Sequence, residues 1–324
     1  MDLSLKTLIR FIFATTIIPI GLVCNIIALI IFKRQKLNQR NIFGYLYSWL
    51  CMFDILSLLN EMVFAFLEYL NIELIAYSNI TCKTLFGWVK YVNHLPSFQI
   101  IIIAFYLYVT ICHHNKRDKF HKNRLKLILL MISFVTLVDL VYVIYDKHVI
   151  YNSYENKTTF GNKEIIEYKC ETVFLLDFIL DITNVIMRDF IPFILIFVLN
   201  YLSIKGFLKS KSNSNQRVNK KDYQFFRSII GSNLIFLTIY FPWAIVFILY
   251  HIHHSFDMFD ELIESDQFEV IKRLFECFAY LNNMTCFFLN MCLNSRFLSE
   301  FLYLFKLRRE ISSDGISTNH FNNI

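Results

Sequence analysis

Seven long apolar runs set the main limit on what this chain can fold into. At ~1.5 Å per helical residue, a run of roughly 20 residues or more crosses the hydrocarbon core of a bilayer. Strands are a poor alternative because the runs lack strand alternation, and a lipid-facing backbone has to satisfy its own hydrogen bonds. We therefore predict an all-α membrane protein, a seven-transmembrane helix bundle. The expected spans are residues 8–32, 42–69, 83–113, 125–146, 173–205, 225–252 and 268–293.

Composition supports the membrane class and argues against others. Hydrophobic residues make up 56% of the 324 residues and charged residues only 18%, which is typical of a membrane protein. The net charge of +6 is small and concentrated in loops, so we expect no nucleic-acid partner. The sequence has no phosphate-binding loop, nucleophile constellation or metal-ligand spacing. We therefore expect neither an enzyme nor a metal centre built from clustered ligands, and we expect membrane lipid as the surroundings.

A shorter amphipathic segment, residues 296–308, follows the seventh run. Phe297, Phe301 and Phe305 recur every four residues, and the charged residues fall elsewhere on the helical wheel. This pattern predicts a short amphipathic helix on the membrane surface. The expected organisation is one seven-transmembrane domain over 1–309 and a polar cytoplasmic tail over 310–324.

Loop charges predict the orientation of the bundle. Of the 32 Lys and Arg residues, 21 fall in the segment 296–309 and in the loops 33–40, 114–126 and 205–227. Because basic loops stay on the cytoplasmic side, the amino terminus is expected to be extracellular. We therefore expect a multi-pass protein of the plasma membrane.

Cysteine placement predicts one disulfide on the outer side. Of the eight cysteines, only Cys82 and Cys170 lie outside an apolar run or at its edge, so we expect them to pair. The bridge would tie the third span to the loop 147–171 and contribute ~4 kcal/mol in the chain-entropy model. Two free thiols are the alternative. The sequon at Asn156, in the same loop, is the expected glycosylation site.

Several residues in register along these runs resemble those of a known family. Helix one has Gly21 and Asn25, helix two has "LCMFD" ending at Asp54, and the third span begins at Cys82. Further landmarks are Cys170, Pro192, Phe236, Pro242 and the join "NMCLNSRF". Together they resemble the rhodopsin-like G-protein-coupled receptors, in particular the peptide-receptor-like subgroup. The resemblance implies a cell-surface receptor that relays ligand binding through helix movement to a heterotrimeric G protein.

Three landmarks depart from the family pattern. Tyr106-Leu107-Tyr108 stands where the family has Asp-Arg-Tyr, so the acid and the arginine are missing. "CFFLN", ending at Asn290, replaces Asn-Pro-x-x-Tyr, and Tyr240 replaces the toggle tryptophan. Two alternatives therefore stay open: a seven-span receptor without normal G-protein coupling, and a multi-pass transporter or channel subunit.

The resemblance also assigns an activation switch to the inner spans. Its members are Phe236, Tyr240, Pro242, Pro192 and the triplet Tyr106, Leu107 and Tyr108. Each proline removes a backbone hydrogen bond and kinks its helix, so Pro242 could be a pivot for the sixth span. A static kink is the alternative.

A lone carboxylate, Asp54, lies inside the second span. An ionised group at that depth is costly unless it is paired or solvated. We expect a polar core of Asp54 with Asn25, Ser97, Asn282 and Asn283, read either as a structural sodium site or as a purely hydrogen-bonded cluster.

Ionisable and aromatic residues in the outer halves of the spans indicate a ligand pocket. Intramembrane charges usually face a bundle interior and mark a site, although each one singly can be a helix-end charge reaching the interface. The position of Val89 lacks the aspartate of amine receptors, and Tyr280 stands where opsins have their retinal lysine. We therefore expect an extracellular peptide ligand, with a basic one favoured. The pocket candidates are Glu61, Val89, Lys90, Tyr91, His94, Trp243, Glu276 and Tyr280.

Overall fold

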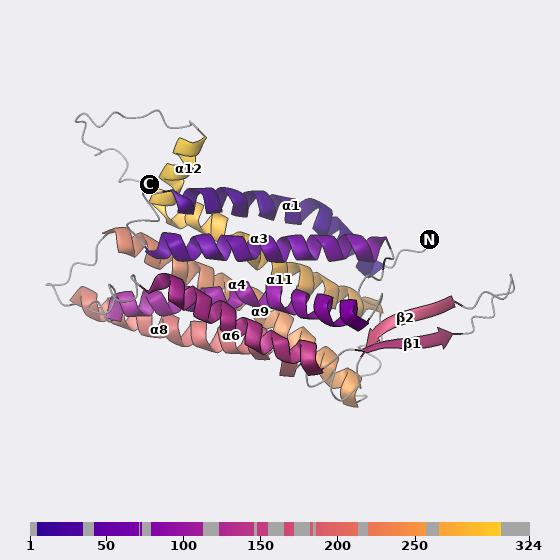
Figure 1. Ribbon diagram of the computed structural model, residues 1–324. Helices are drawn as coiled ribbons and strands as arrows, with labels where there is room; N and C mark the ends of the chain where they lie inside the picture. The colour runs from indigo at the N-terminus through magenta and orange to yellow at the C-terminus, as the bar shows by residue number, and fades with distance from the viewer. Residues whose placement is uncertain are drawn as a thin grey trace.

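Long helices lie side by side along most of the chain in the computed structural model (Figure 1). The structure describes residues 5–34, 42–70, 72, 79–112, 123–145, 148–154, 165–171, 182–183, 186–212, 220–256 and 266–305. The long helices are α1 (Leu5–Lys33), α3 (Ile42–Tyr69), α4 (Asn79–Cys112), α6 (Arg124–Tyr145), α8 (Ile191–Ser212), α9 (Lys220–Phe256) and α11 (Asp266–Leu293). A short π-helix, η3 (Ile186–Phe190), leads into α8. Each apolar run of the sequence thus carries a helix, although residues 173–181 of the fifth run lie outside the described part.

Five of the described helices are long and apolar enough to cross a membrane. They are Leu5–Lys33, Phe43–Tyr69, Ile80–Cys112, Ile191–Lys209 and Phe226–Val246. In α6 the apolar stretch is shorter, Leu125–Val138, and α11 carries several charged residues in its first three turns. The chain is therefore almost entirely helical and compatible with a multi-pass, all-α membrane protein. The count of seven spans stays a prediction.

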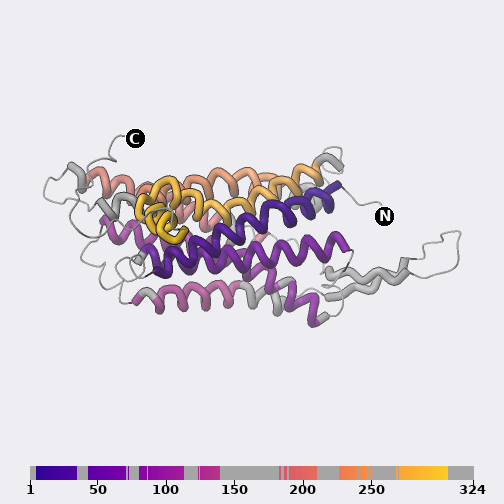
Figure 2. Tube along the Cα trace, turned by 90° about the horizontal axis from the view of Figure 1, so that it is seen from above, coloured from indigo at the N-terminus to yellow at the C-terminus, as the bar shows by residue number. Residues whose placement is uncertain are grey.

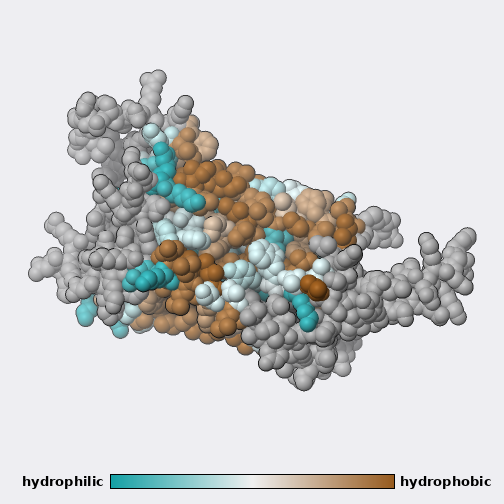
Figure 3. Space-filling view, in the orientation of Figure 1, coloured by the Kyte–Doolittle hydropathy of each residue, from teal (hydrophilic) through white to brown (hydrophobic). Residues whose placement is uncertain are grey.

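The outward faces of these helices are apolar, as a lipid environment requires. Figure 3 shows hydrophobic side chains over much of the described surface. Leu130 and Leu137 of α6 are 69% and 64% exposed, and Phe197 of α8 is 58% exposed. Such continuous exposed apolar surface is unfavourable in water and favourable against lipid tails.

The two ends of the bundle are distinguished by two small elements (Figures 1 and 2). An antiparallel hairpin of β1 (His148–Tyr154) and β2 (Ile165–Glu171) projects from the end where α1 begins, which we call the hairpin end. The short helix α12 (Ser295–Leu304) lies at the opposite end, which we call the α12 end. The hairpin was not predicted from the sequence, although β-branched and aromatic residues in "HVIYNSY" and "IIEYKCE" favour strands.

Helix α12 coincides with the expected surface helix from residue 295, and residues beyond 305 lie outside the described part. Asn294 caps it by accepting a hydrogen bond from the backbone N–H of Phe297. Phe297 is fully buried, with its ring 5.0 Å from that of Phe32 and 5.9 Å from that of Phe287. The apolar stripe of α12 therefore packs on α1 and α11.

Close approach of α1 to its neighbours depends on Gly21. A Cβ at this position would lie 2.7 Å from Cγ of Met284 in α11 and 3.1 Å from Cδ1 of Leu58 in α3. The missing side chain lets the helices pack closely, as small residues do in membrane bundles. One turn further along, Asn25 is thereby brought within reach of α11.

Candidate functional site

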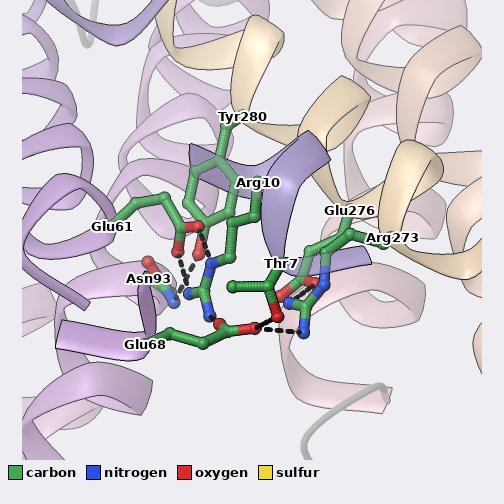
Figure 4. Close-up of polar contacts among 8 residues, drawn as sticks. All are labelled: Thr7, Arg10, Glu61, Glu68, Asn93, Arg273, Glu276 and Tyr280. Atoms are coloured by element: carbon green, nitrogen blue, oxygen red, sulfur yellow. Dashed lines mark hydrogen bonds and ion pairs between the residues drawn. The ribbon is translucent and has the colours of Figure 1, made fainter. Parts of the chain in front are cut away.

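Arg10 of α1 is the centre of an ion-pair network at the hairpin end (Figure 4). Its Nε donates to Oε1 of Glu61 at 2.6 Å, and its Nη2 donates to Oε2 of the same carboxylate at 2.8 Å. Its Nη1 donates to Glu68, which lies on the same face of α3 as Glu61. This two-pronged geometry is the strong form of an arginine–carboxylate contact, and it joins α1 to α3.

Helix α11 enters the same network through Arg273 and Glu276. Nη1 of Arg273 donates to Oε2 of Glu276 at 2.5 Å, and Nη2 lies 3.5 Å from Oε1 of Glu68. Thr7 of α1 also donates to Oε1 of Glu68, at 3.3 Å. We call the five charged residues, Arg10, Glu61, Glu68, Arg273 and Glu276, the hairpin-end network. Its members come from three helices, α1, α3 and α11, and α11 lies far along the chain from the other two.

Burial within the network is uneven. The side chains of Glu61 and Arg10 are 4% and 15% exposed, whereas those of Glu68, Arg273 and Glu276 are 21–29% exposed. Taking an arginine and a carboxylate out of water costs several kcal/mol each, and the paired geometry offsets this cost. Three carboxylates against two guanidinium groups leave the network one negative charge in excess.

A chain of hydrogen bonds begins beside the network and leads toward the middle of the bundle. Nδ2 of Asn93 in α4 lies 3.4 Å from the hydroxyl of Tyr280, which Figure 4 places beside Arg10 and Glu61. Ser57 donates to Oδ1 of Asn93 at 3.0 Å and accepts from Nδ2 of Asn283 at 3.0 Å. Two of the expected pocket residues, Glu61 and Glu276, thus belong to the hairpin-end network, and Tyr280 begins the path that leads inward.

The residues of the expected polar core are all buried. Asn25, Asp54, Ser97, Asn282 and Asn283 are 0–5% exposed. Nδ2 of Asn25 donates to the backbone oxygen of Asn283 at 2.6 Å, which ties α1 to α11. We call these five residues together with Ser57 the polar core.

Several oxygens of the polar core have no hydrogen-bond partner among the described residues. They are Oδ1 of Asn25, Oδ1 of Asn282, Oδ1 of Asn283 and Oγ of Ser97. Unpaired buried acceptors are costly and point to an unseen water or cation. Amide, hydroxyl and carboxylate oxygens are the donors that hard cations prefer, so this set fits a sodium ion as well as a water cluster.

The expected switch residues are spread along the bundle: the triplet Tyr106–Tyr108 lies in the half of α4 toward the α12 end, whereas Pro192 lies at the start of α8, at the opposite end. Tyr106 and Leu107 of α4 are 1% and 2% exposed, and the ring of Tyr106 lies 5.1 Å from that of Phe43. Phe236 of α9 is fully buried in the same core. Tyr108 is partly buried, and Pro192 and Pro242 lie within α8 and α9. The side chain of Tyr240 lies outside the described part.

The remaining pocket candidates are spread over α4 and α9. His94 and Trp243 are 0% and 5% exposed, and Trp243 belongs to the main hydrophobic core. Val89, Lys90 and Tyr91 are partly buried, with the Tyr91 ring 6.1 Å from that of Trp88.

Cys82 is disulfide-bonded and fully buried, at the start of α4. Six other cysteines are free thiols: Cys24, Cys51, Cys112, Cys277, Cys286 and Cys292. The backbone of Cys170 lies in β2, opposite Val149, but its side chain is outside the described part, so its pairing with Cys82 stays a prediction. Asn156 also lies outside the described residues.

Sequence reasoning missed three members of the hairpin-end network, Arg10, Glu68 and Arg273. A signal for Arg10 was present, because an arginine inside an apolar run is expensive and calls for a partner. The partner itself could not be read from the sequence, since Arg10 and Glu61 are 51 residues apart.

Comparison of the sequence with protein-family models and with curated proteins gives no match.

Proposed function

We propose that the chain is a seven-span receptor of the plasma membrane, of the rhodopsin-like kind, with the hairpin end outside the cell. The observation that carries the proposal is the polar path from the hairpin-end network to the polar core. It runs from Arg10 and Glu61, past Tyr280 and Asn93, to Ser57 and Asn283. A ligand that disturbs the outer end of this path would alter contacts deep in the bundle. A receptor requires such a link, because its ligand acts by shifting an equilibrium between two conformations.

The orientation rests on charge. The basic loops 33–40, 114–126 and 205–227 adjoin the helix ends opposite the hairpin. Under the positive-inside rule, the α12 end faces the cytoplasm and the hairpin faces outward. In that arrangement the partner inside is a heterotrimeric G protein at the α12 end.

The ligand is a peptide that presents a basic group. The carboxylates of Glu61 and Glu68 already hold one guanidinium, that of Arg10, so their spacing suits this group. The excess negative charge of the network favours a cationic partner over an anionic one. An arginine or amine of the ligand would compete with Arg10 for these carboxylates and free α1 from α3.

A sodium ion fits the polar core and would supply positive charge beside Asp54. The ion would be coordinated by the amide oxygens of Asn25, Asn282 and Asn283 and the hydroxyl of Ser97, or these oxygens would accept hydrogen bonds from its waters. Losing such an ion would loosen the contact of α1 with α11.

One observation favours a second candidate, a receptor of the same fold without normal G-protein coupling. Leu107 stands at the position of the family arginine and is 2% exposed, in the main hydrophobic core. A buried leucine offers no positive charge to a partner at that position.

The test is a second-messenger screen of cells that express the full chain, exposed to a panel of basic and acidic peptides. We expect a basic peptide to raise the signal, and Glu276→Gln to weaken its potency by about tenfold, the loss of roughly one charge contact. Glu300→Gln, the same change at the α12 end, is the matched control and should leave the binding of a labelled basic peptide unchanged. Surface expression is measured for every variant.

Three results separate the candidates. Binding of a labelled basic peptide without any second messenger, restored by Leu107→Arg, favours the uncoupled receptor. Equal potency on Glu276→Gln and wild-type protein would remove the hairpin-end network from the ligand site. Neither binding nor signal from any peptide, at normal surface expression, would overturn the proposal of a peptide receptor.

A further inference from the structure

Two thiols from distant parts of the chain meet inside the bundle, in the half toward the α12 end. Cys51 of α3 and Cys286 of α11 are 0% and 2% exposed, and both are free. Their thiols are hydrogen-bonded to each other. We call these two residues the thiol pair. The sequence does not indicate it, because its members lie in the second and seventh apolar runs.

Polar groups approach the thiol pair from two helices. Nδ2 of Asn290, one turn along α11, donates to Sγ of Cys286 at 3.7 Å. The hydroxyl of Tyr47, one turn before Cys51 on α3, interacts electrostatically with both thiols. The ring of Tyr47 stacks on that of Phe32, with centroids 5.1 Å apart, which holds the hydroxyl in place. Two hydrogen-bond donors therefore lie beside the sulfur atoms.

The hydroxyl of Tyr47 is a donor that the described contacts leave unused. Tyr47 is 1% exposed, and its hydroxyl oxygen has no hydrogen-bond partner among the described residues. An unpaired buried hydroxyl costs free energy, so it calls for an acceptor. Thiolate sulfur is a better acceptor than a neutral thiol, and a bound metal ion converts the one into the other.

Two adjacent thiols suit a soft monovalent cation. Thiolates select Cu(I), which is stable with two sulfur ligands in a linear arrangement. Structural zinc is four-coordinate. Among the residues that the structure describes, no group of three or more His, Cys, Asp or Glu side chains could hold a metal ion. The thiol pair therefore fits Cu(I) and does not fit zinc.

A line of polar side chains connects the thiol pair with the α12 end. Nδ2 of Asn294, at the junction of α11 and α12, donates to Oδ1 of Asn290 at 3.2 Å. Oγ of Ser228 in α9 donates to the same oxygen at 3.0 Å. In the orientation proposed above, this end faces the cytoplasm, where cysteines stay reduced and copper is present as Cu(I). The polar line gives the ion an entry path from that side.

We propose that Cys51 and Cys286 bind one Cu(I) ion between α3 and α11. Tyr47 and Asn290 donate hydrogen bonds to the sulfur atoms. Both S–H bonds break, two Cu–S bonds form, two protons leave to solvent and no electron is transferred. The product carries one net negative charge. Because Asp54 interacts electrostatically with both thiols, its carboxyl group must be protonated or paired with a cation when copper is bound.

The test titrates the full purified chain in detergent with Cu(I), without oxygen and with ascorbate, against a coloured Cu(I) chelator. Cys112 and Cys292, the more accessible free thiols, are first replaced by serine. We expect about one bound Cu(I) per chain, with two sulfur ligands in its X-ray absorption spectrum. Cys51→Ser and Cys286→Ser should each abolish this binding.

The two hydrogen-bond donors give a second readout that keeps both metal ligands. Tyr47→Phe and Asn290→Leu should leave one ion bound and weaken its affinity about tenfold, since they remove only hydrogen bonds to its ligands. Copper should also raise the Tm of the protein that keeps both cysteines, because the ion binds the folded state. Where a serine variant fails to fold, these two variants still carry the test.

Cys277→Ser is the matched control, because Cys277 is a second buried cysteine of α11 but lies beside Arg10 and Glu276 of the hairpin-end network. It should leave copper binding unchanged. The copper site is overturned by any of three results: no bound Cu(I) with both cysteines present, full binding after Cys51→Ser or Cys286→Ser, or an equal loss in Cys277→Ser. None of these measurements depends on receptor activity.

Discussion

The two ends of the bundle are held by different chemistry. At the hairpin end, Arg10 and Arg273 bind three carboxylates and join α1, α3 and α11. At the α12 end, amides and hydroxyls join α8, α9 and α11. A buried charge that loses its partner is expensive, whereas a lost amide contact costs little. The comparison indicates that α1, α3 and α11 are tied firmly at the hairpin end, whereas α9 is tied more weakly to α8 and α11 in its half toward the α12 end.

The largest effect is expected from Arg10→Met. This change leaves the carboxylate of Glu61, whose side chain is 4% exposed, without its two-pronged partner, so we expect a loss of about 3–5 kcal/mol in the free energy of unfolding. Adding Glu61→Leu removes the stranded carboxylate and should restore most of the loss. Thermal unfolding of the purified protein in detergent measures both, and equal stability of Arg10→Met and wild type would show that the pair does not tie α1 to α3.

A smaller effect is expected from Asn233→Leu at the other end. The change removes one neutral hydrogen bond to Asn200 and keeps the branched shape of the side chain, so we expect a loss of about 0.6 kcal/mol. The same unfolding assay applies. A loss as large as that of Arg10→Met would contradict the inference that the helices are tied more weakly toward the α12 end than at the hairpin end.

The smallest effect is expected from Arg273→Gln, at the exposed rim of the hairpin-end network. Its contacts with Glu68 and Glu276 are partly solvated, so we expect a loss of about 0.5 kcal/mol or less. Raising the ionic strength from ~0.1 M to ~1 M should abolish this difference and spare that of Arg10→Met. If high salt reduced the stability losses of Arg273→Gln and Arg10→Met equally, the pair of Arg10 and Glu61 would be as accessible to water as the contacts of Arg273.

Much of the fold could be predicted because a membrane helix is a local property of the sequence. Every apolar run contains a helix, and α12 begins within one residue of its expected start. The hairpin was missed, since its strands are short and lie in a loop. Five described helices are long and apolar enough to span, whereas charged residues such as Arg273 and Glu276 lower the apolar character of α11.

The candidate site could be predicted only in part. Asn25, Asn282 and Asn283 were expected beside Asp54, and the structure buries all four. Glu61 was expected as a candidate residue of a ligand pocket, and the structure pairs it with Arg10. Burial of a polar residue follows from its place in an apolar run, but its partner does not.

The sequence by itself determined which segments become helices and which polar side chains must be buried within them, because both follow from the cost of exposing backbone and charge to lipid. Only the tertiary structure decided that Arg10 meets Glu61 and that Asn200 meets Asn233. These pairs are 51 and 33 residues apart. Their meeting depends on how each helix is rotated and which helices are neighbours, and packing against other helices sets both.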